Sequence, residues 1–195
     1  MKRLLCFGDS NTYGYRPVEG RFAYETRWTG QLAARLGADW QLIEAGLNGR
    51  TAGHYDDIWP ELNGVDVIAA YVRRCAPLSL VLVMLGSNDV VYAPAEQAAA
   101  DLGLLLDQLL SALDGSAARV LVLAPPVGQF PRLGYPGAAR LAPLYRQLAK
   151  ERGLCFADAG RWPLEMKDDG CHLTAADHRV FAGEVYRSLQ ELALL

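Results

Sequence analysis

Three polar groups in this sequence have the types and positions that a nucleophilic serine reaction needs. Ser10 follows the apolar run 4–7 and a Gly-Asp pair, Asn88 follows a second apolar run, and His172 stands three residues after Asp169. An apolar run that ends at turn-forming residues predicts a buried strand that delivers Ser10 to the edge of a sheet, where a helix begins. Serine is a weak nucleophile and needs a base within hydrogen-bond reach, which at neutral pH is most often histidine.

His172 is the best candidate for that base among the three histidines. Asp169 can turn back to accept a hydrogen bond from the ring Nδ1–H, which would fix the tautomer and support the imidazolium. His178 falls inside a predicted helix, and His54 lies in a loop where it could contact a substrate but has no partner for a catalytic role. Each motif also has a structural alternative, because an Asp-x-x-His turn is common and Ser10 could simply cap a helix.

A tetrahedral intermediate also needs hydrogen-bond donors for its oxyanion. Asn88 can offer a side-chain N–H, while Ser10 and Gly49 can offer backbone N–H groups. The alternatives are that Asn88 ends a strand as a turn residue and that Gly49 supplies a turn with positive φ. Taken one at a time, these residues do not decide between the two interpretations.

The elements that must position these groups alternate between strand and helix. Strands are predicted at residues 4–7, 40–43, 80–85, 120–123 and 155–157, and helices at 27–36, 65–75, 94–113, 138–152 and 174–192. This alternation predicts an α/β fold, a three-layer doubly wound sandwich with a five-stranded parallel sheet and right-handed crossovers. Each candidate residue follows a predicted strand, so we expect all of them at the carboxyl ends of the strands, where such folds bind ligands.

Composition narrows the class of partner. A chain of 195 residues with 51% hydrophobic content suits a single domain over residues 1–195. The net charge of -3 and the scattered charges favour neither nucleic acid nor a membrane surface, so a small-molecule substrate is expected. The four cysteines form no C-x-x-C pair, so we expect neither a metal site nor a cofactor. The apolar run behind the basic start is too short for a signal peptide and no run has the length of a transmembrane segment, so we expect a cytoplasmic location.

Four blocks taken together resemble those of the SGNH, or GDSL, hydrolases. They are Gly8–Ser10, Gly49 within Gly46–Thr51, Gly86–Asp89 and Asp169–His172. The resemblance implies the SGNH hydrolase fold with a flavodoxin-like strand order. It also implies the roles of the site residues: a catalytic triad of Ser10, His172 and Asp169, and an oxyanion hole formed by Ser10, Gly49 and Asn88.

Within that family, the segments Cys6–Ser10, Arg27–Gly30 and Ile43–Leu47 resemble the arylesterase and acyltransferase branch. The resemblance implies a metal-free serine esterase that acts on small acyl or aryl esters through an acyl-enzyme, which water or another alcohol then releases. Asn11 stands where the family pattern has leucine, and we expect the chemistry to be unaffected. Residues 55–63 and 128–137 are shorter than the corresponding loops of that branch, so the substrate range and a homo-oligomeric state stay open.

Aromatic residues near the proposed rim are expected to narrow the cleft around the acyl chain, although core packing is the commoner role for such residues. They are Tyr13, Tyr15, Trp28, Tyr55, Trp59, Tyr92, Phe130 and Trp162. Of these, we expect Trp28, Tyr55 and Trp162 to contact substrate.

Other functions compatible with the same residues are a carbohydrate acetylesterase, a thioesterase or a lysophospholipase of the family, and an inactive scaffold used for binding. A rival from another class is a flavodoxin-like FMN-binding module, in which residues 10–12 would cradle a phosphate at a helix N-terminus. That rival would leave Asn88 and the Asp169–His172 pair without a role.

Overall fold

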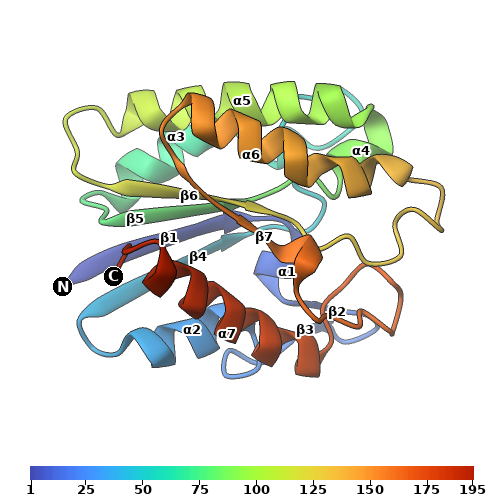
Figure 1. Cartoon of the computed structure of the whole chain (residues 1–195), viewed down its shortest axis with the longest axis horizontal. Helices are drawn as coiled ribbons and strands as arrows, with labels where there is room; N and C mark the ends of the chain where they lie inside the picture. Colours follow the sequence, from blue (N-terminus) through green and yellow to red (C-terminus); the bar gives the residue numbers. More distant parts are fainter.

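A five-stranded parallel sheet forms the middle of the molecule in the computed structural model, which describes residues 1–195 (Figure 1). Its strands are β1 (Lys2–Gly8), β4 (Trp40–Gly46), β5 (Leu80–Met84), β6 (Arg119–Ala124) and β7 (Cys155–Asp158). The spatial order β4-β1-β5-β6-β7 is the flavodoxin-like order, with the second strand of the sheet outside the first. The predicted fold class is therefore confirmed.

Helices cover both faces of this sheet (Figure 1). On one face lie α3 (Gly64–Cys75), α5 (Ala95–Ala112) and α6 (Leu141–Glu151), and on the other lie α2 (Trp28–Leu36) and α7 (Ala175–Glu191). None of these helices combines the length and the hydrophobicity that a membrane span requires.

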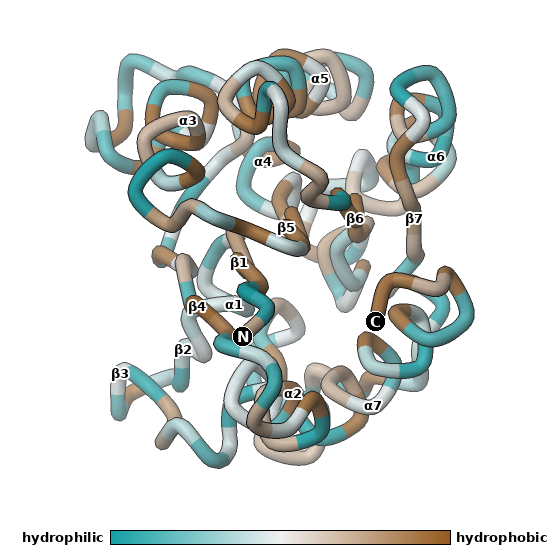
Figure 2. Tube along the Cα trace, turned by 90° about the vertical axis from the view of Figure 1, so that its left-hand side faces the viewer, coloured by the Kyte–Doolittle hydropathy of each residue, from teal (hydrophilic) through white to brown (hydrophobic).

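Each helical layer encloses its own hydrophobic core against the sheet. Along β1, Leu5 and Phe7 enter the core under α3 and α5, whereas Leu4 and Cys6 enter the core under α2 and α7, as the period of two in a strand requires. Figure 2 shows hydrophobic residues along the strands between the helical layers. Every residue of β5 is buried, which matches the expectation that its uninterrupted apolar run forms a central strand.

The three adjacent strands β4, β1 and β5 end at the same level of the sheet. Gly8 at the end of β1 pairs with Gly46 of β4 on one side and with Met84 of β5 on the other. Gly46 has no room for a side chain, because a Cβ there would lie 2.1 Å from the backbone nitrogen of Tyr13. The chain segments that follow these strands therefore emerge side by side.

Some short elements lie outside the predicted ones. A small antiparallel hairpin joins β2 (Tyr15–Arg16) to β3 (Gly20–Arg21), and α4 (Asp89–Tyr92) follows β5. Short 3-10 helices are found at η1 (Pro60–Leu62), η2 (Pro136–Arg140) and η3 (Ala159–Arg161). Because η2 occupies the start of the predicted helix 138–152, α6 begins only at Leu141. The start of α7 is fixed by a capping box between Thr174 and Asp177.

Candidate active site

Ser10, His172 and Asp169 form one chain of hydrogen bonds at the carboxyl end of the sheet. The Ser10 Oγ lies 3.0 Å from His172 Nε2, and His172 Nδ1 lies 2.7 Å from Asp169 Oδ2. Ser10 is the first residue of α1 (Ser10–Tyr13), but the side chain that caps this helix belongs to Asp9, which accepts a hydrogen bond from the Asn11 N–H. The Ser10 hydroxyl is therefore not used as a cap and faces the imidazole.

Asp169 is held as a carboxylate by three donors. Its Oδ1 accepts hydrogen bonds from the backbone N–H groups of Cys171 at 2.9 Å and of His172 at 2.8 Å, while Oδ2 faces the imidazole. Partial burial alone would raise the pKa of Asp169, but the hydrogen bonds from the His172 ring and from the two N–H groups outweigh it and lower the pKa. A carboxylate that stays ionised can orient the ring and support its positive charge.

Beside the serine and histidine lies a pocket of about 360 Å³. Its walls are formed by Ser10, Tyr15, Asn48, Gly49, Asn88 and His172. Gly49 adopts φ +78, a conformation that favours glycine, and its N–H has no hydrogen-bond partner within the chain. The Ser10 N–H is at the first position of a helix, where no carbonyl of that helix can accept it. These donors and the Asn88 amide border the same space.

Asn88 and Asp89 tie the loop after β5 to the loop after β4. The Asn88 Nδ2 donates to the carbonyl of Arg50 at 2.9 Å. The Asp89 carboxylate accepts hydrogen bonds from the N–H groups of Ala52 and Gly53 at 2.9–3.0 Å. Burial raises the pKa of Asp89 to about 6 despite these N–H donors. The two residues thus hold the segment that contains Gly49 in a fixed relation to the Asn88 amide.

Arg50 supports the same corner from inside the protein. Its guanidinium is buried, donates to the carbonyls of Gly8 and Ala45, and lies over the Phe7 ring at 4.3 Å from the ring centroid. Burial lowers its pKa, and the Tyr71 hydroxyl, 3.3 Å from one guanidinium nitrogen, counteracts this effect. Arg50 therefore joins the ends of β1 and β4, a role that no pattern in the sequence indicated.

Trp28 was expected to contact the substrate, but it lies in the core instead. Its side chain is completely buried, its Nε1–H donates to the carbonyl of Asn11 at 3.0 Å, and its ring packs against Phe181. The Trp28 ring has a large apolar contact and its N–H has a buried acceptor, so the indole is satisfied in the core and does not face the pocket.

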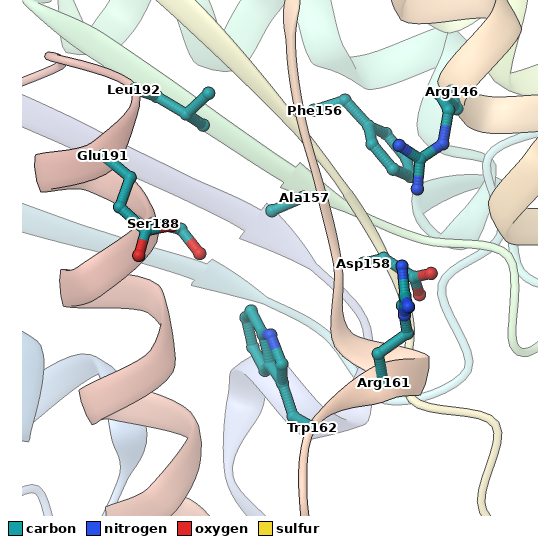
Figure 3. A pocket seen from close by; sticks show the side chains of 9 residues that line it. All are labelled: Arg146, Phe156, Ala157, Asp158, Arg161, Trp162, Ser188, Glu191 and Leu192. Carbon is teal, nitrogen blue, oxygen red and sulfur yellow. The ribbon is translucent and has the colours of Figure 1, made fainter.

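The other two expected substrate contacts also lie outside the walls of this pocket. The Tyr55 hydroxyl donates to Asp101 at 3.1 Å, and its ring stacks at a tilt on Tyr92. Trp162 borders a separate cavity of about 270 Å³ between β7 and α7 (Figure 3). Its ring packs edge-on against Phe181. Trp162 directly follows the turn η3, at the position that ends it.

Two wall residues were not among the expected substrate contacts, although Tyr15 was one of the aromatic residues expected near the rim. Tyr15 stands on the hairpin β2–β3, and its ring centroid is 4.6 Å from that of His172. Asn48 directly precedes Gly49 in the same loop. Its position next to the predicted oxyanion donor is the sequence signal that could have identified it. No group of three or more His, Cys, Asp or Glu side chains is arranged to hold a metal ion.

Comparisons with known proteins agree with this architecture. The model of the GDSL-like Lipase/Acylhydrolase family matches residues 6–180. Among solved structures, the native M. smegmatis aryl esterase is 36% identical with a TM-score of 0.88, and the match covers 100% of both chains. Est24, a carbohydrate acetylesterase from Sinorhizobium meliloti, is 33% identical with a TM-score of 0.89, over 98% of this chain and 100% of that one. A carbohydrate acetylesterase family member from the same organism is 32% identical with a TM-score of 0.82, over 99% of this chain and 97% of that one.

A search of the curated proteins gave no match. The fold and the family model nevertheless define the class, which is that of a carboxylic ester hydrolase. The chain belongs to the GDSL-like lipase/acylhydrolase family, the SGNH hydrolases, which confirms the resemblance seen in its four blocks.

Proposed function

We propose that this protein hydrolyses small carboxylic esters by a serine mechanism in which Ser10 is the nucleophile. The observation that carries the proposal is the hydrogen-bonded chain from the Ser10 hydroxyl through His172 to Asp169, with distances of 3.0 and 2.7 Å. These distances fall within the range expected for a nucleophile, its base and the group that orients the base.

In the proposed acylation step, the Ser10 Oγ forms a bond to the ester carbonyl carbon and its proton passes to His172 Nε2. The tetrahedral intermediate then collapses, the bond to the alcohol oxygen breaks, and that oxygen takes the proton from His172. In deacylation, water attacks the acyl-enzyme while His172 removes its proton, and the carboxylic acid leaves as Ser10 regains its own proton.

The oxyanion of both intermediates would be held by the N–H groups of Ser10 and Gly49 and by the Asn88 side chain. One amide N–H of Asn88 is already used by the Arg50 carbonyl, which fixes the amide plane and leaves the second N–H for the substrate. Donors that are held in place before the reaction stabilise developing charge without reorganisation, and this is usually the largest single contribution to such catalysis.

The pocket favours short acyl groups. Its volume is about 360 Å³, and Tyr15 is the only hydrophobic residue in its walls. A long acyl chain would find little apolar surface there, which argues against a lysophospholipase. Acyl transfer to a small alcohol is the further activity we propose, because an alcohol could replace water in deacylation.

A carbohydrate acetylesterase is the second candidate. Asn48 and Asn88 give the pocket a polar wall that suits a hydroxyl-rich leaving group, and the similar structure from S. meliloti is a carbohydrate acetylesterase. Both candidates share the same triad and differ only in the alcohol that leaves.

An ester panel tests the proposal. The wild type and Ser10→Ala are compared on p-nitrophenyl acetate, phenyl acetate, an acetylated sugar and an acetyl thioester. Hydrolysis by the wild type that disappears in Ser10→Ala supports the mechanism, and equal rates in the two proteins would contradict it. A higher kcat/KM for the acetylated sugar than for phenyl acetate would select the second candidate.

A further inference from the structure

The side chain of Asn11 grips the backbone on both sides of His172. Its Nδ2 donates to the carbonyl of Cys171 at 3.1 Å, and its Oδ1 accepts from the N–H of Leu173 at 2.9 Å. One amide thus pairs with the two peptide groups that flank the imidazole. We call this pair of hydrogen bonds the Asn11 clamp.

Asn11 is itself held firmly in α1, directly after the nucleophile. Its side chain is buried, with 3% exposure for the residue, and its N–H donates to the Asp9 carboxylate at 2.9 Å. Its carbonyl accepts from the Trp28 indole at 3.0 Å. Asn11 therefore cannot shift without moving the first turn of α1, which carries Ser10.

The histidine loop has few other links to α1. Asp169 bonds to the N–H groups of Cys171 and His172, but all three residues are part of the loop, and Gly170 accepts from Gln129 on another segment. The hydrogen bonds that join the loop to α1 are the two of the Asn11 clamp and the one between Ser10 and His172. Asn11 thus makes the only hydrogen bonds between α1 and the backbone of the histidine loop.

We propose that Asn11 is a positioning residue, which sets the distance between Ser10 Oγ and His172 Nε2 through the backbone of the histidine loop. This inference rests on the proposed function, in which His172 is the base. It also differs from the expectation based on the sequence, which was that an asparagine in place of the family's leucine would leave the chemistry unaffected. A leucine at this position could not pair with the Cys171 carbonyl or the Leu173 N–H.

Two variants and a matched control test the clamp. Asn11→Asp has nearly the same shape and keeps an acceptor for the Leu173 N–H, but it places an oxygen in place of the donor to Cys171. Asn11→Ser is neutral and too short for either contact, and it serves if Asn11→Asp fails to fold. The control is Asn63→Asp, because Asn63 is a buried asparagine that pairs with both backbone groups of Tyr55 at 2.9 and 3.5 Å, outside the walls of the pocket.

The measurements are kcat and KM with p-nitrophenyl acetate, the thermal midpoint, and the NMR signal of the proton on His172 Nδ1. A misplacement of about 1 Å can cost roughly 10²-fold in rate, so we expect kcat to fall about 10- to 100-fold in the Asn11 variants. KM should stay within about threefold, because Asn11 does not contact the pocket walls other than the histidine loop and α1, and the oxyanion donors Gly49 and Asn88 are unchanged. The His172 signal should broaden or shift. In Asn63→Asp the midpoint should fall while kcat and the His172 signal stay near their wild-type values.

Wild-type kcat in both Asn11 variants would overturn the proposal, as would an equal loss of kcat in Asn63→Asp. Failure of the proposed function gives a different result, since Ser10→Ala would then match the wild type or the wild type would not cleave esters. In that case the His172 signal still decides the clamp, and an unchanged signal in Asn11→Ser would overturn it.

Discussion

The side-chain amide of Asn88 donates to the backbone carbonyl of Arg50 at 2.9 Å, and this hydrogen bond joins the loops that follow β5 and β4. Arg50 in turn reaches back with its guanidinium to the carbonyls of Gly8 and Ala45 at the ends of β1 and β4. Three adjacent strands are thus connected just where the proposed oxyanion donors stand. The orientation of the Asn88 amide is a property of the whole edge of the sheet rather than of one loop.

Substitution of Asn88 should therefore affect the transition state more than the bound substrate. We expect Asn88→Ala to lower kcat by about 10²–10³-fold, because it removes one donor to the developing oxyanion. KM should change less, since a neutral ester carbonyl makes a weaker hydrogen bond than an oxyanion. Steady-state kinetics with p-nitrophenyl acetate measure both values. A rise in KM at constant kcat would instead identify Asn88 as a contact to the ground-state substrate.

Ser10 and His172 should behave as one unit. We expect Ser10→Ala and His172→Ala each to lower kcat by on the order of 10⁴ or more, and the double variant to be little worse than either single variant. The residual rate would come from the oxyanion donors and from substrate binding. Circular dichroism would check that each variant is folded. Losses that multiply in the double variant would indicate that the two side chains have separate roles.

The placement of Ser10 and Asn88 at the carboxyl edge of the sheet could be predicted, because the sequence signals for it are local. An apolar run that stops at turn residues marks the end of a buried strand, and Ser10 and Asn88 both follow such runs. Parallel strands share one carboxyl edge, so residues far apart in the sequence could be expected to meet there. The Asp169–His172 pair followed from its Asp-x-x-His spacing, just before the predicted helix 174–192, and α7 indeed begins at Ala175.

Which of the rim aromatic residues line the pocket could not be predicted in the same way. Tyr15 reaches the imidazole because the hairpin β2–β3 turns back over the site, and no local pattern sets the direction of such a turn. Trp28 is different, because its spacing of four residues from Leu32 places both on the buried stripe of α2, which is a signal for the core. The Asn11 clamp depends on two residues more than 150 positions further along the chain and left no trace in the sequence.

The dimensions of the pocket lead to a prediction about acyl length. With about 360 Å³ and one hydrophobic wall residue, the site should favour acetate and butyrate esters over palmitate when kcat/KM is compared among p-nitrophenyl esters. Addition of a small alcohol to the acetate reaction should also yield some transesterified product, because a confined acyl-enzyme is partly shielded from water. A preference for palmitate would contradict the short-acyl prediction and favour a lysophospholipase. Absence of the transesterified product would count only against acyl transfer.

The last prediction concerns His178, which stands in α7 and is completely buried beneath α2. Its Nδ1 accepts the N–H of Trp28 at 3.2 Å, and the Phe22 ring packs edge-on against it. Burial lowers the pKa of His178 to about 4; the nearby Asp177 carboxylate opposes this lowering, and Arg27 adds a lesser lowering of its own. The imidazole is therefore neutral in the folded protein at pH 7.

Because the folded pKa lies below the unfolded value of 6.5, the unfolded chain binds more protons between these two values. The stability that depends on neutral His178 is present above pH 6.5 and is lost as the pH falls towards 4. The loss amounts to about 3 kcal/mol of unfolding free energy. His178→Gln keeps an acceptor for the Trp28 N–H but does not titrate, so its stability should fall less steeply with acid.

Urea unfolding of wild type and His178→Gln at several pH values between 7 and 4 measures this difference. The comparison between the two proteins cancels the effect of the buried carboxylates of Asp9 and Asp89, which titrate in the same range in both. His54→Gln is the matched control. Hydrogen bonds to Asp66 raise the pKa of that exposed histidine, so its removal should change the pH dependence of stability in the direction opposite to His178→Gln. Parallel pH curves for wild type and His178→Gln would contradict a neutral, buried His178.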